Sequence, residues 1–372
     1  MIRSTGRPPR SLMGESLSRR RLVGAALGAA LAGGGIARAQ ALAAQEARIS
    51  FKAKAIYLDP RVTQGPVATG ALLDLIDRTE LNALVVDVKE NGVFYETGVP
   101  FFRDANAVTA LYDPAALLAE LRRRGIYSIA RLVCFKDTPV AMARPDLAVI
   151  DVTTGLPWRD MAGHAWVNAL QPELWEANAA LAVEAAELGF DEIQYDYVRF
   201  PTDGNLATMS FGVPLSEQAR TSAILDFLGQ TKVRLAPLGT RLSADIFGFT
   251  LVVDHDLGIG QNAELIGEVV DVVCPMVYPS HWPYGSIAVG GLPNDFPYET
   301  VQVSMEFAKG KLPDEERRIR PWLQGFSLPG YRPYGSHDVR AQIDAAEAAG
   351  VGGWMIWDMG NRYFEEAFRP QD

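Results

Sequence analysis

The chain has 372 residues, of which 45 are acidic and 35 are basic, so its formal net charge at pH 7 is −10. The first 39 residues hold seven of the arginines and one glutamate, so the remaining 333 residues carry 44 acidic and 28 basic side chains, a balance of −16. An acidic surface of this kind argues against nucleic acid and anionic membrane surfaces as partners, because both are bound through clustered cations.

Residues 1–39 have the pattern of an export signal. Residues 18–23 read Ser-Arg-Arg-Arg-Leu-Val, a twin-arginine motif, an apolar run extends from Leu22 to Ile36, and residues 37–39 read Ala-Arg-Ala, a small-residue cleavage site. The alternative is a membrane anchor, but a spanning helix needs roughly 20 apolar residues and this run is shorter. We therefore predict export through the twin-arginine pathway to the periplasm or the cell exterior. The mature chain would start at Gln40 and contain no membrane span.

After Gln40 the sequence alternates between strand-like and helix-like segments. The runs that predict strands are Lys52–Leu58, Ala83–Lys89, Tyr127–Phe135, Asp191–Phe200, Arg241–Gly248, Val269–Tyr278, Arg320–Ser327 and Val351–Met359. The helical patterns between them include Ala71–Arg78, Pro114–Arg124, Pro172–Leu188, Glu217–Leu235 and Ser336–Ala349. This alternation predicts one α/β domain over residues 40–372, a (β/α)8 barrel. An open doubly wound sheet is the alternative, but no glycine-rich nucleotide-binding motif follows any strand.

The predicted fourth strand lies within Gly189–Pro201, which reads G-F-D-E-I-Q-Y-D-Y-V-R-F-P. Alternation along a strand separates its side chains into two faces. One face would hold Ile193, Tyr195 and Tyr197, and the other Glu192, Gln194, Asp196 and Val198. Polar residues on one face are unusual for a buried parallel strand. In a closed barrel Asp196 would lie inside, near the carboxyl end of the strand, where barrel enzymes hold their active sites.

Three long loops are expected after strands, at residues 136–171, 202–216 and 279–299. Long loops at the carboxyl ends of barrel strands build the active site. The third loop is rich in aromatic side chains, namely His281, Trp282, Tyr284, Phe296 and Tyr298. These rings suit stacking on sugars, and they equally suit a lid that packs on itself.

Alternation within each predicted strand also directs a set of polar and aromatic side chains toward one barrel mouth. The set consists of Asp87, Lys89, Arg131, Gln194, Asp196, Ser243, Asp245, Tyr278, Trp322, Gln324 and Asp358. Each residue alone is typical of a hydrogen-bonded structural position. Together they are hard to explain as core, because buried charges are costly unless they are paired.

Several kinds of catalytic site are disfavoured. The chain has four histidines and no H-x-H or H-E-x-x-H pair, so we expect no metal and no other cofactor. The run Asp254-His255-Asp256 is interpreted as solvated surface in a connecting loop. No G-x-S-x-G motif is present. Cys134 and Cys274 are predicted on distant strands with opposite facing, so we expect two buried, unlinked thiols.

The candidate catalytic residues that remain are paired carboxylates with aromatic side chains nearby, as glycoside hydrolysis requires. The motifs that carry a family resemblance are Gly189–Pro201, Ser243–Gly248, Cys274–His281 and Arg320–Gln324, together with Ala83–Lys89 and Trp158–Asp160. With these motifs in order from about Lys54 to Tyr363, the chain resembles a bacterial family of glycoside hydrolase domains formerly catalogued as a domain of unknown function. The resemblance implies a TIM barrel distantly related to the alpha-amylase type.

By this resemblance, Asp196 would be the nucleophile at strand four and Asp245 the acid/base at strand five. Amylase-type enzymes carry Glu at the second position, and this chain carries the shorter Asp. The expected substrate-binding residues are Asp87, Lys89, Arg131, Arg199, Tyr278, His281, Trp322, Gln324 and Asp358. The partner would be a poly- or oligosaccharide of the cell envelope or the exterior, and the alternative is a barrel that binds glycan without catalysis. The sequence defines no oligomeric state.

Overall fold

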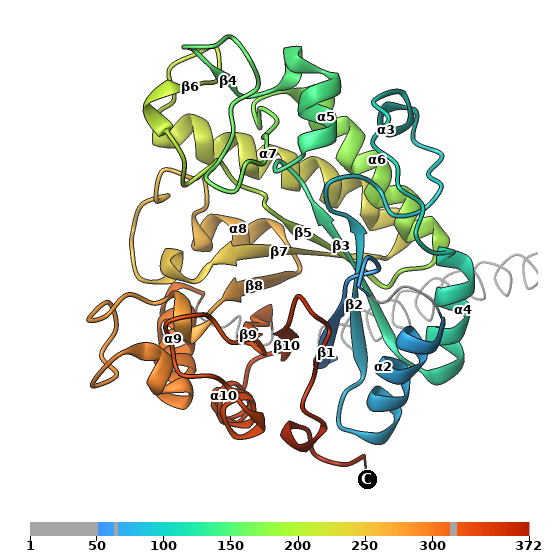
Figure 1. The fold of residues 1–372 in the computed structure, drawn as a ribbon, viewed down its shortest axis with the longest axis vertical. Helices are drawn as coiled ribbons and strands as arrows, with labels where there is room; N and C mark the ends of the chain where they lie inside the picture. The colour runs from blue at the N-terminus through green and yellow to red at the C-terminus, as the bar shows by residue number, and fades with distance from the viewer. Residues whose placement is uncertain (1–50, 63–65, 313–317, 372) are drawn as a thin grey trace, which may run out of the picture. The chain divides into compact units, whose positions relative to one another are not determined.

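The computed structural model describes residues 51–62, 66–312 and 318–371. Eight parallel strands close into a barrel in the order β1-β10-β9-β8-β7-β5-β3-β2 (Figure 1). The barrel strands are β1 (Ala53–Leu58), β2 (Ala83–Lys89), β3 (Tyr127–Val133), β5 (Glu192–Asp196), β7 (Arg241–Phe247), β8 (Val272–Met276), β9 (Trp322–Gln324) and β10 (Gly353–Trp357). The predicted (β/α)8 TIM barrel is thereby confirmed.

Helices connect successive strands and cover the outside of the ring (Figure 1). They are α2 (Pro66–Arg78), α3 (Pro100–Asp104), α4 (Pro114–Arg124), α5 (Thr138–Ala143), α6 (Pro172–Leu188), α7 (Glu217–Leu235), α8 (Ala263–Val269), α9 (Pro297–Lys311) and α10 (Ser336–Ala348). Three predicted helices have the observed bounds, and the helices at α3, α5, α8 and α9 were not predicted. None of the helices in the described part of the chain has both the length and the apolar character needed to cross a membrane.

The ends of α4 and α6 follow from local sequence. Asp113 caps α4, because its carboxylate accepts hydrogen bonds from the first backbone N–H groups of the helix, and Pro114 follows at the first helical position. Gly125 ends α4 with φ 70°, and Gly189 ends α6 with φ 111°. Only glycine adopts this left-handed backbone without a steric cost. Gly189 therefore turns the chain from α6 into β5.

The outer face of the barrel carries the apolar core. On β5, Ile193 and Tyr195 are fully buried in the layer between the strands and the helices. Tyr195 stacks on Phe227 of α7 with the ring centroids 4.8 Å apart, and its hydroxyl donates a hydrogen bond to the carbonyl oxygen of Asn178 in α6. This face of β5 was predicted correctly from its alternation.

The inner face of β5 has three polar levels. At the amino end Glu192 forms a buried ion pair with Arg320, at 2.8 Å between Oε1 and Nη1. In the middle Gln194 Nε2 lies 3.4 Å from Cys274 Sγ. Asp196 forms the top level at the carboxyl end of the strand. Polar side chains thus replace the apolar filling that is usual inside such barrels.

The chain departs from the predicted alternation directly after Asp196. Tyr197 adopts a left-handed backbone with φ 49°, which is uncommon for a bulky residue. The prediction that Tyr197 faces outward with Ile193 was therefore wrong, and Val198 packs in the apolar core rather than in the barrel interior. Five other strands, β3, β7, β8, β9 and β10, also end before their predicted limits.

Two antiparallel residue pairs form a small sheet outside the barrel, between β4 (Ile150–Asp151) and β6 (Met209–Ser210). This sheet joins the long loops that follow β3 and β5 and was not predicted. The expectation for Asp256 was also wrong. Its carboxylate is buried and pairs with Arg220 of α7 at 2.7 Å, and it accepts hydrogen bonds from Gly258 and Gly260.

Both cysteines are free and buried, as predicted. Cys274 lies on β8 inside the barrel, whereas Cys134 lies one residue beyond β3 and packs in the outer apolar layer. The proposed export signal, residues 1–39, lies outside the described residues.

Candidate active site

Arg131 of β3 connects two carboxylates at the mouth of the barrel. Its Nε and Nη2 lie 3.0 and 2.6 Å from Asp196 Oδ2, and its Nη1 lies 2.5 Å from Asp87 Oδ1. All three side chains are buried. Neighbouring strands supply them, because β2, β3 and β5 are adjacent in the sheet. Charge-assisted hydrogen bonds of this kind hold both side chains in fixed positions.

Asp196 is surrounded by donors. In addition to the two N–H groups of Arg131, the backbone N–H of Tyr197 lies 2.6 Å from Asp196 Oδ1. Tyr197 itself has a left-handed backbone, with φ 49°. Three N–H donors and a guanidinium charge together stabilise the anionic carboxylate.

Asp245 of β7 has the opposite surroundings. Its side chain is 1% exposed, and its Oδ1 accepts a hydrogen bond from the Trp322 indole N–H at 2.8 Å. Its Oδ2 is sealed from solvent and has no hydrogen-bond partner among the described residues. Burial raises the pKa of the Asp245 carboxyl well above its usual range, and the negative charge of Asp196 raises it further. When the carboxyl is neutral, Oδ2, which accepts no hydrogen bond from the described residues, is the oxygen free to carry the proton.

Asp87 lies deeper than the other two carboxyl groups and is fully buried. Its Oδ2 accepts a hydrogen bond from the Tyr57 hydroxyl at 2.5 Å. Burial raises the pKa of Asp87 to about 7, against the opposing effect of Arg131. Since both of its oxygens have protein partners, Asp87 orients Arg131 rather than facing the mouth.

Two aromatic residues that were not among the predicted site residues pack against Arg131. Tyr57 of β1 and Trp357 of β10 stack with centroids 4.1 Å apart, and the Arg131 guanidinium carbon lies 4.8 Å from the Trp357 ring. Trp322 meets Trp357 edge to face at 5.5 Å. Alternation from Met355, which faces Gln194 inside the barrel, would have placed Trp357 on the same inner face. That pattern was available in the sequence.

Three of the predicted binding residues have structural partners instead of facing the two carboxylates. Lys89 is buried and pairs with Asp137 at 2.7 Å. Gln324 accepts a hydrogen bond from the backbone N–H of Ser280 and donates one to the Phe326 carbonyl, so it joins two loops. Asp358 accepts a hydrogen bond from the backbone N–H of Gly360 at 2.6 Å in the turn after β10.

Tyr278 and His281 lie together after β8. Their rings are 5.3 Å apart, and Phe326 completes an edge-to-face cluster with both. Burial raises the pKa of Tyr278 well above its usual range, and the nearby charges of Asp245 and Asp196 add to this rise. The Tyr278 hydroxyl therefore remains protonated beside the two carboxyl groups.

The aromatic loop after β8 combines the two roles considered for it. Trp282 is buried and packs on Phe249 with centroids 5.6 Å apart, as in a loop that packs on itself. Tyr284 is 78% exposed and remains available to a ligand.

Lys136, Tyr197 and Arg199 form a second charged group at the mouth. The Lys136 ammonium lies 3.8 Å from the centre of the Tyr197 ring, and the Arg199 guanidinium carbon lies 4.8 Å from it. Arg199 also packs on Trp166 and Phe247, at 4.9 and 4.5 Å. Its guanidinium thus lies in an aromatic enclosure and makes no ion pair with Asp196.

One group of acidic side chains in the described part of the chain has metal-like spacing, namely Asp59, Asp87 and Glu90. Arg61 already binds Asp59 at 2.8 Å and Glu90 at 2.5 Å, and Arg131 binds Asp87. The positive charge that a metal would supply is therefore provided by arginine.

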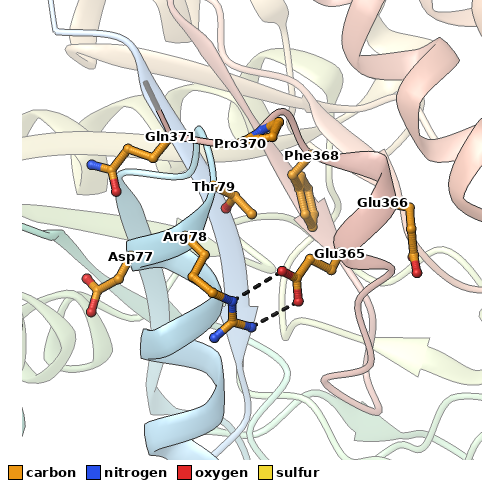
Figure 2. Close-up of a pocket in the computed structure, with 8 residues that line it drawn as sticks. All are labelled: Asp77, Arg78, Thr79, Glu365, Glu366, Phe368, Pro370 and Gln371. Atoms are coloured by element: carbon orange, nitrogen blue, oxygen red, sulfur yellow. Dashed lines mark hydrogen bonds and ion pairs between the residues drawn. The ribbon is translucent and has the colours of Figure 1, made fainter.

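A surface depression of about 910 Å³ lies at the other end of the barrel (Figure 2). Arg78 and Thr79, which line it, come directly before β2, whereas Asp196 and Asp245 lie at the carboxyl ends of their strands. Figure 2 shows the Arg78–Glu365 ion pair on its wall, with 2.9 Å between Nη2 and Oε2. This depression is separate from the paired carboxylates.

The fold is a TIM barrel with carboxylates at the carboxyl ends of its strands. The chain belongs to the family described as "Putative glycosyl hydrolase domain", whose sequence profile matches residues 55–363. No curated protein matches the chain.

Several solved structures are similar to this barrel. The glycoside hydrolase domain of PgaB (BpsB) from Bordetella bronchiseptica is 12% identical, with a TM-score of 0.63 over 84% of this chain and 95% of that one. The spore cortex-lytic enzyme SleL from Bacillus cereus is 13% identical, with a TM-score of 0.53 over 86% and 73%. A hypothetical protein from Ruminiclostridium thermocellum is 35% identical, with a TM-score of 0.46 over 51% and 96%. The first two likenesses concern the fold.

Proposed function

We propose that the protein is a glycoside hydrolase that cleaves a poly- or oligosaccharide of the cell envelope or the exterior, with Asp196 and Asp245 as its catalytic pair. The observation that carries this proposal is the contrast between the two carboxyl groups. Asp196 accepts hydrogen bonds from three N–H groups, two of them on Arg131, whereas burial and the negative charge of Asp196 raise the pKa of Asp245. A nucleophile or base beside an acid is the pair that glycosidic cleavage needs.

The strand register supports a short separation between the two groups. Tyr195 of β5 pairs with Ala244 of β7, so the next residue on each strand is one of the two aspartates. Neighbouring strands lie about 4.8 Å apart. A retaining mechanism needs carboxyl groups about 5 to 5.5 Å apart, whereas an inverting one needs about 6.5 to 9.5 Å. The proposal is therefore a retaining mechanism.

In the first step Asp196 attacks the anomeric carbon and forms a glycosyl ester, while the glycosidic C–O bond breaks and Asp245 gives its proton to the leaving oxygen. In the second step Asp245, now a carboxylate, takes a proton from water, and the hydroxide attacks the anomeric carbon and releases Asp196. Trp322 orients Asp245 through its indole N–H throughout. The Asp245 carboxyl ends the cycle protonated, as it began.

The test is the release of reducing ends from cell-wall and exopolysaccharide preparations. We expect Asp196→Asn and Asp245→Asn each to lower turnover by at least about 100-fold, because general acid catalysis alone contributes about 10² to 10⁴. Asp254→Asn is the matched control, because the Asp254 side chain is 97% exposed and lies in the loop after β7. It should retain wild-type turnover.

The glycan-binding alternative predicts a different result in the same assay. A wild-type protein that binds a glycan and releases no reducing ends from it would support that alternative. Near wild-type turnover in either active-site variant would remove that residue from the catalytic pair.

Export through the twin-arginine pathway is part of the proposal, supported by the motif at residues 18–23 and the small residues before Gln40. Replacing Arg19 and Arg20 by Lys should leave uncleaved precursor in the cytoplasm, as measured by cell fractionation and the mass of the chain. A control replaces Arg38 by Lys, which keeps the charge at that position and leaves the paired arginines intact. Unchanged export of the Arg19, Arg20 variant would contradict this part of the proposal.

A further inference from the structure

The mouth of the barrel contains two buried arginines whose hydrogen bonds differ. Arg131 uses its Nε and Nη2 edge to bind Asp196 and its Nη1 to bind Asp87. Arg199 uses Nη1 alone, which lies 2.9 Å from the Phe200 carbonyl oxygen and 3.5 Å from Thr202 Oγ1. Within the described residues, the Nε and Nη2 edge of Arg199 has no hydrogen-bond partner.

The open edge of Arg199 reaches solvent although the side chain as a whole is 6% exposed. The buried polar atoms without a partner in the described part of the chain do not include Nε or Nη2 of Arg199, so neither atom is sealed inside the protein. The flat faces of the guanidinium are covered by Trp166, Tyr197 and Phe247. An edge that is open while the faces are covered can accept a ligand in one orientation only.

Nearby carboxylates do not neutralise Arg199. Asp196, Asp203 and Asp160 exert an electrostatic effect on it, yet none of them forms an ion pair with it among the described residues. Asp160 accepts hydrogen bonds from Trp166 Nε1 and the His164 backbone, and Asp203 accepts one from the Met161 backbone. Burial lowers the pKa of the Arg199 guanidinium, as expected for a cation without a full counter-charge.

Lys136 adds a second positive charge to the same position. Its ammonium packs on the Tyr197 ring that Arg199 also contacts, and its nearest carboxylate oxygen, on Glu90, lies 3.7 Å away. That Glu90 carboxylate is already bound by Arg61 at 2.5 Å. Two cations on one ring repel each other, and an anion between or beside them would relieve this repulsion.

The strained backbone of Tyr197 is an independent sign of a built site. The residue has φ 49°, its N–H donates to Asp196 Oδ1, and its ring contacts both Lys136 and Arg199. Residues held in sparsely populated backbone regions cluster at functional sites. The same turn thus serves Asp196 and the cationic group.

We infer that Arg199 and Lys136 form a subsite for a carboxylate, so that the glycan substrate carries a uronic acid or a similar acidic sugar next to the bond that is cleaved. The Nε and Nη2 edge of a guanidinium matches the two oxygens of a carboxylate, as Arg220 demonstrates with Asp256, whose Oδ2 and Oδ1 accept one hydrogen bond each. The assignment of the acidic sugar as substrate rests on the proposed hydrolysis, whereas binding of the acid does not.

The net charge of the protein limits the kind of polymer. The acidic excess of the whole chain disfavours a polyanion with a charge on every residue at long range. A glycan with isolated acidic sugars among neutral ones avoids this repulsion and still presents a carboxylate to the subsite.

The test measures binding by calorimetry, with sodium glucuronate and sodium galacturonate as probes and glucose and galactose as their neutral counterparts. We expect wild-type protein to bind at least one uronate about tenfold more tightly than its neutral counterpart, because a hydrogen bond to a charged group contributes about that factor. Arg199→Met should remove this preference without changing the affinity for the neutral sugar. Arg199→Lys should keep part of the preference, because the charge remains and the two-pronged edge is lost.

Lys136→Met provides a second variant in case Arg199→Met does not fold, which thermal unfolding would reveal, and it should weaken uronate binding to a smaller degree. Arg144→Met is the control, because this arginine forms exposed ion pairs with Asp146 and Glu173.

Glucose 6-phosphate is a further probe. The inference would be overturned if the protein preferred the phosphate to the uronates, bound acidic and neutral sugars equally, or bound no uronate at all. It would also be overturned if the folded variants kept the wild-type preference. A protein that prefers uronates and hydrolyses nothing would refute the hydrolase and leave this subsite standing.

Discussion

Asp196 and Asp245 follow each other around the barrel on adjacent strands, yet their surroundings have little in common. The Asp196 carboxylate accepts from three N–H groups and pairs with a guanidinium, whereas the Asp245 carboxyl accepts from one indole N–H and has a buried oxygen without a partner among the described residues. The same side chain is therefore stabilised as an anion on one side and as a neutral acid on the other. The neighbouring side chains, Arg131 of β3 at Asp196 and Trp322 of β9 at Asp245, therefore give two residues of the same type different acid–base roles.

The largest expected effect comes from removing Arg131, the cation that Asp87 and Asp196 share. Replacing Arg131 by Met would leave Asp87 and Asp196 buried without their shared cation. We expect the free energy of unfolding at pH 7 to fall by about 3 to 5 kcal/mol, as for other buried pairs that lose one partner. Urea denaturation measures the change. Arg123→Met, which removes an exposed ion pair with Glu120, should cost no more than about 1 kcal/mol. Equal losses in the two variants would show that Arg131 is not the centre of the Asp196 side.

Asp245 has a pH signature of the opposite kind. Because its folded-state pKa is raised above the unfolded value near 4, the folded protein binds more protons above that pH, and stability falls as pH rises. Asp245→Asn removes this dependence. The variant should gain stability relative to wild type by up to about 1.4 kcal/mol for each pH unit from pH 4 upward, until the folded-state pKa is passed.

Urea denaturation of both proteins between pH 4 and pH 8 measures this difference. Asp254→Asn, at an exposed position, is the control for a lost aspartate. A constant difference between Asp245→Asn and wild type across this range would mean that Asp245 is ionised in the folded protein.

The smallest expected effect comes from Trp322, the hydrogen-bond donor to Asp245. Trp322→Phe keeps most of the ring and removes the N–H that bonds Asp245 Oδ1. Since that hydrogen bond lowers the pKa of Asp245, its loss should move the alkaline limb of the pH–rate profile to higher pH and lower kcat by roughly tenfold. Trp354→Phe is the control, because Trp354 packs on Phe368 outside the barrel. A fall in kcat with an unmoved alkaline limb would assign Trp322 to packing alone.

Much of this arrangement could be predicted from the sequence. Alternation along regular strands places Arg131, Asp196 and Asp245 inside the barrel, and the strand-helix alternation defines the barrel itself. The partners of these residues could be predicted less well. Lys89 was expected to face the mouth, yet its ammonium is buried against Asp137, the N-cap residue of α5. Loop conformation decides such pairings, and no periodicity encodes it.

Tyr197 illustrates the same limit at a single backbone position. Alternation continued past Asp196 predicts an outward side chain, because the pattern assumes an extended backbone. The left-handed φ of Tyr197 breaks this assumption, and the alternation of the sequence does not encode it. Tyr57 and Trp357 were missed for another reason, since aromatic residues in strands are usually assigned to the apolar core.

The seam between β1 and β10 has a consequence for how the protein is made. β1 pairs with β10 along four residues, and the segment after β10 returns to β1, where the Tyr363 hydroxyl donates to the Tyr57 carbonyl at 2.6 Å. During synthesis β1 leaves the ribosome long before β10 and has an unpaired edge until then. The barrel therefore closes only after the last strand is translated, through a contact of very high sequence separation, which makes closure slow. During this interval a chaperone that covers the β1 edge would prevent it from pairing with another chain.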